Sequence, residues 1–185
     1  MTQLVLTAIG EDREGLVSAL SRVVEDQGGN WLDSQFAQLA GTFAGIVLVE
    51  IPEERATALE ASVAELLAEV GWSIEVTRAP EGGSAHGAIP GEAASPSAEP
   101  LRVRLVGQDR PGMVRQISRA LAEQGVSIDS FRSWTTDTPE GGGVLFEAEA
   151  LVRVPESLGE DAVRDALEPL ANELMVDLDL EPAEA

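Results

Sequence analysis

"GQDRPGMV", residues 107–114, ends a run of β-type residues and begins a run with helical periodicity. A second version, "GEDREGLV", occupies residues 10–17 in the same context. Each version places a glycine on both sides of an Asp-Arg pair. The same turn made twice in one chain predicts an internal repeat.

The repeat extends well beyond the turn. At a constant offset of 97 residues, residues 4–28 are identical to residues 101–125 at 10 of 25 positions. The correspondence resumes with "LDS" (32–34) against "IDS" (128–130), and with "LVEIP" (48–52) against "LVRVP" (151–155). The sequence therefore predicts a duplication, with one domain over residues 1–78 and a second over residues 101–181.

Residues 79–100, "APEGGSAHGAIPGEAASPSAEP", separate the two copies. Of these 22 residues, 17 are Ala, Gly, Pro or Ser, and Ile89 is the only bulky apolar one. Such a segment buries too little surface to order itself, so we expect a flexible linker. The only histidine, His86, lies within it, where a solvated residue is favoured over a pH switch or a ligand.

Both copies show the same order of hydrophobic patterns. A β-type run (4–9; 101–106) precedes an amphipathic helix (15–27; 112–124). Two strand-like runs follow (30–38 and 43–51; 127–135 and 144–154), then a second helix (54–69; 157–173) and a last strand (72–76; 174–180). The order βαββαβ, made twice, predicts an α+β protein of two ferredoxin-like domains, each a four-stranded antiparallel sheet with both helices on one face.

Composition excludes several classes of function. The net charge is −21, and all 12 basic residues are arginines. A chain this acidic lacks the basic contacts that carry binding to nucleic acid or to an anionic membrane, so we expect neither as a direct partner. The first residues have neither the basic start nor the apolar run of a signal peptide, which favours a cytoplasmic location.

The residue types also argue against catalysis. The sequence has no cysteine, no lysine and one histidine. These counts exclude a thiolate or Schiff-base nucleophile, a cysteine-ligated metal and a Ser/His couple. We therefore predict no catalytic residue, no metal site and no cofactor.

The repeated turn has the parts of an amino-acid clamp. Backbone N–H groups at a helix start lack intrahelical partners, and the helix dipole favours an anion there. A glycine without a Cβ lets a carboxylate approach those donors, and a nearby aspartate suits an ammonium group. The candidate ligand-binding residues are Asp12, Gly15 and Leu16 in the first copy, and Asp109, Gly112 and Met113 in the second.

A structural role explains the same residues one by one. An aspartate before a helical run commonly caps the helix. Pro111 suits a first helical turn, and a glycine can simply permit close packing. Capping and binding are compatible, and the sequence leaves both interpretations open.

Two βαββαβ units, each with a G-x-D-R-x-G turn between first strand and first helix, resemble tandem ACT domains. The segment "DRPGMVRQISRALAEQGVSID", residues 109–129, is especially similar to ACT units of glycine cleavage system transcriptional repressors. The resemblance covers about 160 of the 185 residues.

This resemblance implies a cytoplasmic, non-catalytic regulatory protein. Such proteins bind a small amino acid at interfaces between paired domains and control a partner protein, here in the transcriptional regulation of glycine or one-carbon metabolism. The resemblance also gives Asn30 and Ser127, at the start of each second strand, a hydrogen bond to the ligand. Glu14 stands where the second copy has Pro111, so the two sites are not expected to be equivalent. An interaction module without an effector, or a regulatory remnant of an amino-acid-metabolism enzyme, stays open.

The expected strand order predicts two different outer sheet faces, because the first strand lies beside the third and fourth. In the second copy, arginines should face acids across the open side of the sheet. The residues are Arg102, Arg104, Glu147, Glu149, Asp177 and Asp179. The same face of the first copy is apolar, with Val5, Ile9, Ile46 and Leu48. We expect the other domain or a second chain to cover it, which makes a homodimer a candidate assembly.

Overall fold

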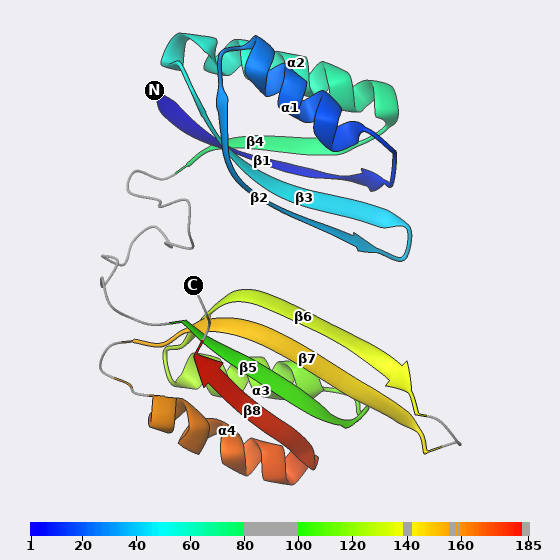
Figure 1. Cartoon of the computed structure of the whole chain (residues 1–185), viewed down its shortest axis with the longest axis vertical. Coiled ribbons are helices and arrows are strands. Elements are labelled where there is room, and N and C mark those ends of the chain that lie inside the picture. Colours follow the sequence, from blue (N-terminus) through cyan, green and yellow to red (C-terminus); the bar gives the residue numbers. More distant parts are fainter. Residues whose placement is uncertain (80–99, 139–141, 156–157, 159, 183–185) are drawn as a thin grey trace. The chain divides into compact units, whose positions relative to one another are not determined.

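The computed structural model describes residues 1–79, 100–138, 142–155, 158 and 160–182. Apart from its two end residues, the linker predicted over residues 79–100 lies outside this range, and so does His86. The chain divides into two compact units, each with its own sheet and helices (Figure 1). The domain boundaries at residues 78 and 101 stay predictions.

The order of elements is βαββαβ in both units. The first unit contains β1 (Thr2–Glu11), α1 (Leu16–Asp26), β2 (Asn30–Leu39), β3 (Thr42–Ile51), the 3-10 turn η1 (Glu53–Arg55), α2 (Ala56–Val70) and β4 (Ser73–Arg78). The second contains β5 (Pro100–Gln108), α3 (Met113–Glu123), β6 (Ser127–Asp137), β7 (Val144–Arg153), α4 (Glu160–Leu174) and β8 (Val176–Pro182).

Each unit has one four-stranded sheet in which every neighbouring pair is antiparallel. The strand orders are β2-β3-β1-β4 and β6-β7-β5-β8, so β1 with β3, and β5 with β7, are the central strands. Both helices of a unit lie on one face of its sheet (Figure 1). The α+β, twice ferredoxin-like prediction is confirmed.

Alternation along the strands builds the two cores. In β1, Leu4, Leu6 and Ala8 are at most 3% exposed, because they point toward the helices. The helical stripe of α1 meets them with Leu20 and Val24, both nearly fully buried. Burying a leucine or valine side chain contributes roughly 1.5–3 kcal/mol, so this two-residue periodicity fixes which face of the sheet carries the helices.

The ends of the elements differ from the prediction by at most three residues, most clearly around the last helix. The sequence predicts a strand from Leu174, but α4 extends through Leu174 and β8 begins at Val176. Met175, between them, has φ 52°. A methionine in the left-handed region is uncommon, and nothing about its apolar side chain predicts that backbone conformation. The end of α4 therefore cannot be located from hydrophobicity.

Close packing explains the first glycine of each repeated turn. A Cβ on Gly10 would overlap the indole ring of Trp72, and one on Gly107 would overlap Val176. The Trp72 indole N–H also donates a hydrogen bond to the carbonyl oxygen of Glu11, at 2.8 Å. The start of the last strand therefore packs directly on the backbone at the end of the first strand.

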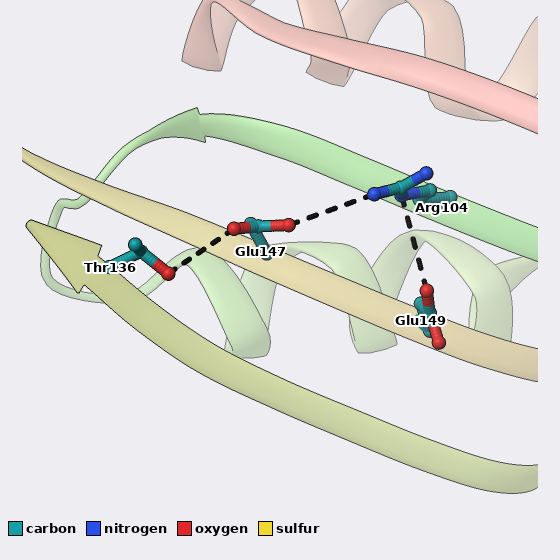
Figure 2. A network of polar contacts seen from close by, with 4 residues as sticks. All are labelled: Arg104, Thr136, Glu147 and Glu149. Carbon is teal, nitrogen blue, oxygen red and sulfur yellow. Dashed lines mark hydrogen bonds and ion pairs between the residues drawn. The ribbon is translucent and has the colours of Figure 1, made fainter. Parts of the chain in front are cut away.

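The outer face of the second sheet is charged. Arg104 on β5 lies between Glu149 on β7 and Asp179 on β8 in the strand register. Its guanidinium is 3.8 Å from Glu147 and 4.0 Å from Glu149 (Figure 2). The Thr136 hydroxyl donates a hydrogen bond to Glu147 at 3.3 Å from the neighbouring strand. The prediction for Arg104 is confirmed.

The prediction for Arg102 is wrong. The strand register places Leu151 and Glu181 opposite Arg102, not the acids expected from the sequence. Among the residues that the structure describes, Arg102 takes part in no ion pair. Arg104 therefore faces an acid on both neighbouring strands, whereas Arg102, two residues earlier on β5, faces one only on β8.

Candidate functional site: the strand–helix turns

The second glycine of each turn begins a helix. Gly15 has φ 81° and Gly112 has φ 93°, the left-handed region that favours glycine. The Gly15 carbonyl accepts a hydrogen bond from Ala19 at 2.9 Å, and that of Gly112 accepts one from Gln116 at 3.0 Å. Both glycines are therefore the N-cap residues of α1 and α3.

The capping interpretation of the aspartates is wrong. Neither α1 nor α3 has a side-chain hydrogen bond at its N-cap, and the cap position belongs to glycine. Asp12 and Asp109 lie three residues earlier, outside the reach that an N-cap side chain uses. The first-turn N–H groups of each helix are thus not satisfied by their own turn's aspartate.

In the first unit, the aspartate of the turn already has a partner. The Asp12 carboxylate accepts a hydrogen bond from the side-chain amide of Gln38, at 2.9 Å. Gln38 lies near the end of β2, and the Asp12 backbone N–H reaches Gly41 in the adjoining hairpin at 3.4 Å. An N–H donor of the protein therefore occupies one oxygen of the carboxylate that an ammonium group would use.

In the second unit, the equivalent carboxylate is left open. The Asp109 backbone N–H bonds to Val144 at 2.8 Å, but no described residue pairs with its side chain. The residue that corresponds to Gln38 at the offset of 97 is Thr135, whose side chain is too short to repeat the contact. The two turns differ, as expected, although the sequence comparison pointed to Glu14 and Pro111 as the difference.

An open pocket of about 550 Å³ lies beside the second turn. It contains three of the predicted residues, Asp109, Gly112 and Met113. Its remaining lining residues, missed by sequence reasoning, are Arg110, Val114, Arg115, Ser118 and Phe146. The three-residue spacing of Gly112, Arg115 and Ser118 places them on one side of a helix. This spacing could have identified Arg115 and Ser118 from the sequence. The pocket thus brings together charges of both signs.

The structure does not bring Asn30 to the turn of its own unit. Asn30 lies in register with Glu50, and Glu50 lies in register with Gln3. Gln3 precedes Asp12 by nine residues, which in a strand is about 30 Å. The start of β2 and the turn are therefore at opposite ends of the first sheet.

The second unit repeats this separation. Ser127 lies in register with Arg153, which is in register with Pro100, nine residues before Asp109. The helix between the first and second strands returns the chain to the end where the first strand began. A turn and a second-strand start can therefore share one ligand only if they come from two different units.

The described residues show two further properties of this chain. No group of three or more His, Cys, Asp or Glu side chains among them is arranged to hold a metal ion. None of the helices in the described part of the chain combines the length and hydropathy needed to cross a membrane.

The chain is a duplicated ferredoxin-like protein with an open pocket beside the strand–helix turn of its second unit. Residues 2–77 match one family model of the ACT domain, and residues 101–170 match another. The chain belongs to the ACT-domain family and contains two ACT domains, as the resemblance implied. Tandem ACT domains favour a regulatory role over a catalytic one.

Solved structures share this duplicated architecture. An unknown protein from Galdieria sulphuraria is 27% identical with a TM-score of 0.84, over 99% of this chain and 99% of that one. A protein named "putative glycine cleavage system transcriptional repressor" is 20% identical with a TM-score of 0.71, over 100% of this chain and 98% of that one. At that identity, the second similarity concerns the fold alone.

A sequence relative matches a short part of the chain. The UPF0237 protein MJ1558 of Methanocaldococcus jannaschii is 37% identical over 51 residues, which are 28% of this chain. The matched segment spans 57% of the length of that relative.

Proposed function

We propose that this chain is a regulatory protein that binds a small amino acid at the pocket of its second ACT domain. The observation that carries the proposal is the charge pattern of that pocket. Asp109 offers a carboxylate to an ammonium group, while the start of α3 and Arg115 offer donors to a carboxylate. Val114, which is 43% exposed, gives the same pocket apolar surface that suits a small side chain, whereas Met113 and Phe146 are themselves core residues.

The first domain is the weaker candidate for this role. The hydrogen bond from Gln38 occupies one oxygen of the Asp12 carboxylate, so an incoming ammonium group would compete with Gln38 for it. An exposed hydrogen bond to a charged group contributes on the order of 1 kcal/mol, and displacing it would lower the affinity by a similar amount. We therefore expect one high-affinity amino-acid site per chain, in the second domain.

The resemblance implies that Asn30 and Ser127 also contact the ligand. The distance of about 30 Å between the two ends of a strand means that either residue would do so from an ACT unit other than the one whose turn holds the ligand. A ligand held in this way stabilises one arrangement of two ACT units over others. This coupling is how amino-acid binding would alter contact with a partner protein. The net charge of −21 supports a protein rather than a nucleic acid as that partner.

The proposed biological setting is the metabolism of small amino acids. Control of glycine or one-carbon metabolism is supported by the resemblance of residues 109–129 to repressor ACT units and by the shared duplicated fold. Glycine and serine are therefore the first amino acids to test.

Thermal unfolding with a panel of free amino acids tests this function. A ligand present at about 100 times its dissociation constant stabilises the folded state by about 2.7 kcal/mol. For domains of this size the melting temperature should rise by several degrees. Glycinamide and N-acetylglycine serve as controls, because each lacks one of the two charges that the pocket recognises. A panel in which no amino acid shifts the melting temperature contradicts the proposal.

An interaction module without an effector is the second candidate. The first domain favours it, because the Gln38 side chain already donates a hydrogen bond to Asp12. This candidate predicts unchanged melting temperatures with every amino acid and undiminished binding to a protein partner.

A further inference from the structure

The turn of the second unit carries a different charge from the turn of the first. Residues 11–18, "EDREGLVS", contain three acids and one arginine, whereas residues 108–115, "QDRPGMVR", contain one acid and two arginines. The net charge is therefore −2 in the first turn and +1 in the second. Three pairs of equivalent residues cause the difference: Glu11 and Gln108, Glu14 and Pro111, Ser18 and Arg115.

Both arginines of the second turn line the pocket of about 550 Å³. Neither Arg110 nor Arg115 forms an ion pair with a residue that the structure describes. Arg110 is half-buried, whereas Arg13, its equivalent in the first unit, is exposed. A half-buried guanidinium without an acidic partner can donate charge-assisted hydrogen bonds to an anion that enters the pocket.

Arg115 lies where a helix disfavours a basic residue. It is the third residue of α3, and the helix dipole gives the first turn a partial positive charge. No acidic residue in that turn offsets this charge. Residues that break a local rule in this way are often found at functional sites. An anion at the start of α3 would pair with Arg115 and with the free backbone N–H groups together.

An amino acid with a neutral side chain leaves one charge of this pocket unpaired. Its ammonium group would pair with Asp109, and its carboxylate would pair with Arg115 and the start of α3. Arg110 would then still have no partner. A ligand whose side chain carries a second negative group would pair with Arg110 as well, so that every charged side chain of the pocket would have a partner of opposite sign.

We propose that the pocket of the second domain selects amino acids whose side chain carries a negative charge, and that Arg110 recognises this group. The inference rests on the proposed amino-acid site and specifies the ligand class of that site. Aspartate and glutamate supply a side-chain carboxylate, and phosphoserine supplies a phosphate. The turn of the first unit has Glu14 beside Arg13 and no arginine at Ser18, so it would disfavour these ligands.

The net charge of the chain, −21, does not prevent an anionic ligand from binding. At physiological ionic strength the Debye length is about 8 Å, so exposed charges farther away are largely screened. The charged side chains that line the pocket would contact the ligand directly and are screened much less. The local charge of the turn therefore decides which ligands bind.

Isothermal titration of the full chain with L-aspartate and L-asparagine tests the proposal, because these ligands have nearly the same shape and differ in side-chain charge. Aspartate should bind about 10-fold more tightly, which corresponds to about 1.4 kcal/mol. Arg110→Gln should lower the affinity for aspartate to that for asparagine and leave the affinity for asparagine unchanged.

Arg13→Gln is the matched control, because it makes the same change in the equivalent turn of the first domain. It should leave both affinities unchanged. Arg110→Lys keeps the positive charge and should retain most of the preference for aspartate. The melting transition of each variant reports whether the domain is folded.

Titration with glutamate and O-phospho-L-serine identifies the side-chain group that binds best. Tighter binding of either ligand than of its neutral counterpart, glutamine or serine, supports the proposal. Equal affinities of the wild type for aspartate and asparagine, or a preference for aspartate that survives Arg110→Gln, would overturn it and leave the amino-acid site in place. A chain that bound none of these amino acids would overturn the proposed function as well, so the two failures are distinguishable.

Discussion

Replacing Gly10 with alanine should lower the free energy of unfolding of the first domain by about 2–3 kcal/mol. The reason is local overpacking, because a Cβ at this position would overlap the indole ring of Trp72. Gly10 has no positive φ, so alanine fits the backbone and the whole cost comes from the contact. Moving the ring would also break its hydrogen bond to the carbonyl of Glu11, at 2.8 Å.

Urea unfolding of Gly10→Ala and Gly15→Ala gives the comparison. No atom lies within 4 Å of a Cβ added to Gly15, so only its φ of 81° opposes the change. A left-handed backbone costs an L residue roughly 1–2 kcal/mol, less than the clash at Gly10. Repeating Gly10→Ala in a Trp72→Ala background should remove most of its effect, since the ring that the Cβ meets is then absent. Equal costs in both backgrounds would show that Trp72 is not the cause.

The contrast between these two glycines shows how far a sequence motif can be interpreted. Both belong to the repeated turn, and the repeat correctly indicates that both matter. Their reasons differ: one is a contact between residues 10 and 72, distant in the sequence, and the other is a local backbone angle. The motif alone predicts the backbone angle at Gly15 but not the contact between Gly10 and Trp72.

The fold itself was accessible because it follows from short-range patterns. Leu4 and Leu6 on one face of β1, with Val5 on the other, fix a sheet that is covered on one side. The turn glycines and the amphipathic helices then leave few ways to connect the strands. The strand order followed from topology, and it correctly placed Arg104 beside Glu149.

The candidate site was accessible only in part, because its decisive contacts are long-range. The hydrogen bond from Gln38 to Asp12 joins residues 26 apart, and no pattern in either copy indicates it. Grouping Asn30 with Asp12 failed within one unit for a related reason. Helix α1 reverses the chain direction, so residues 18 apart in sequence lie at opposite ends of the same sheet.

Asp109→Asn should remove the stabilisation that a bound amino acid provides, a loss of about 2.7 kcal/mol at ligand concentrations near 100 times the dissociation constant. An asparagine of nearly the same size replaces a negative oxygen with an N–H donor, which repels an ammonium group. Asp109 is exposed, so the unliganded variant should unfold within about 0.5 kcal/mol of the wild type.

Asp12→Asn is the matched control for this experiment, since it makes the same chemical change in the equivalent turn. It should weaken the hydrogen bond with Gln38 and leave the ligand-induced shift in melting temperature intact. Isothermal titration of the wild-type chain should then give one amino acid per chain. If Asp12→Asn abolished the shift and Asp109→Asn did not, the open carboxylate would not be the one that binds, and the assignment of the site to the second domain would fail. Equal partial losses would instead mean that both turns bind, with Gln38 as a displaceable side chain.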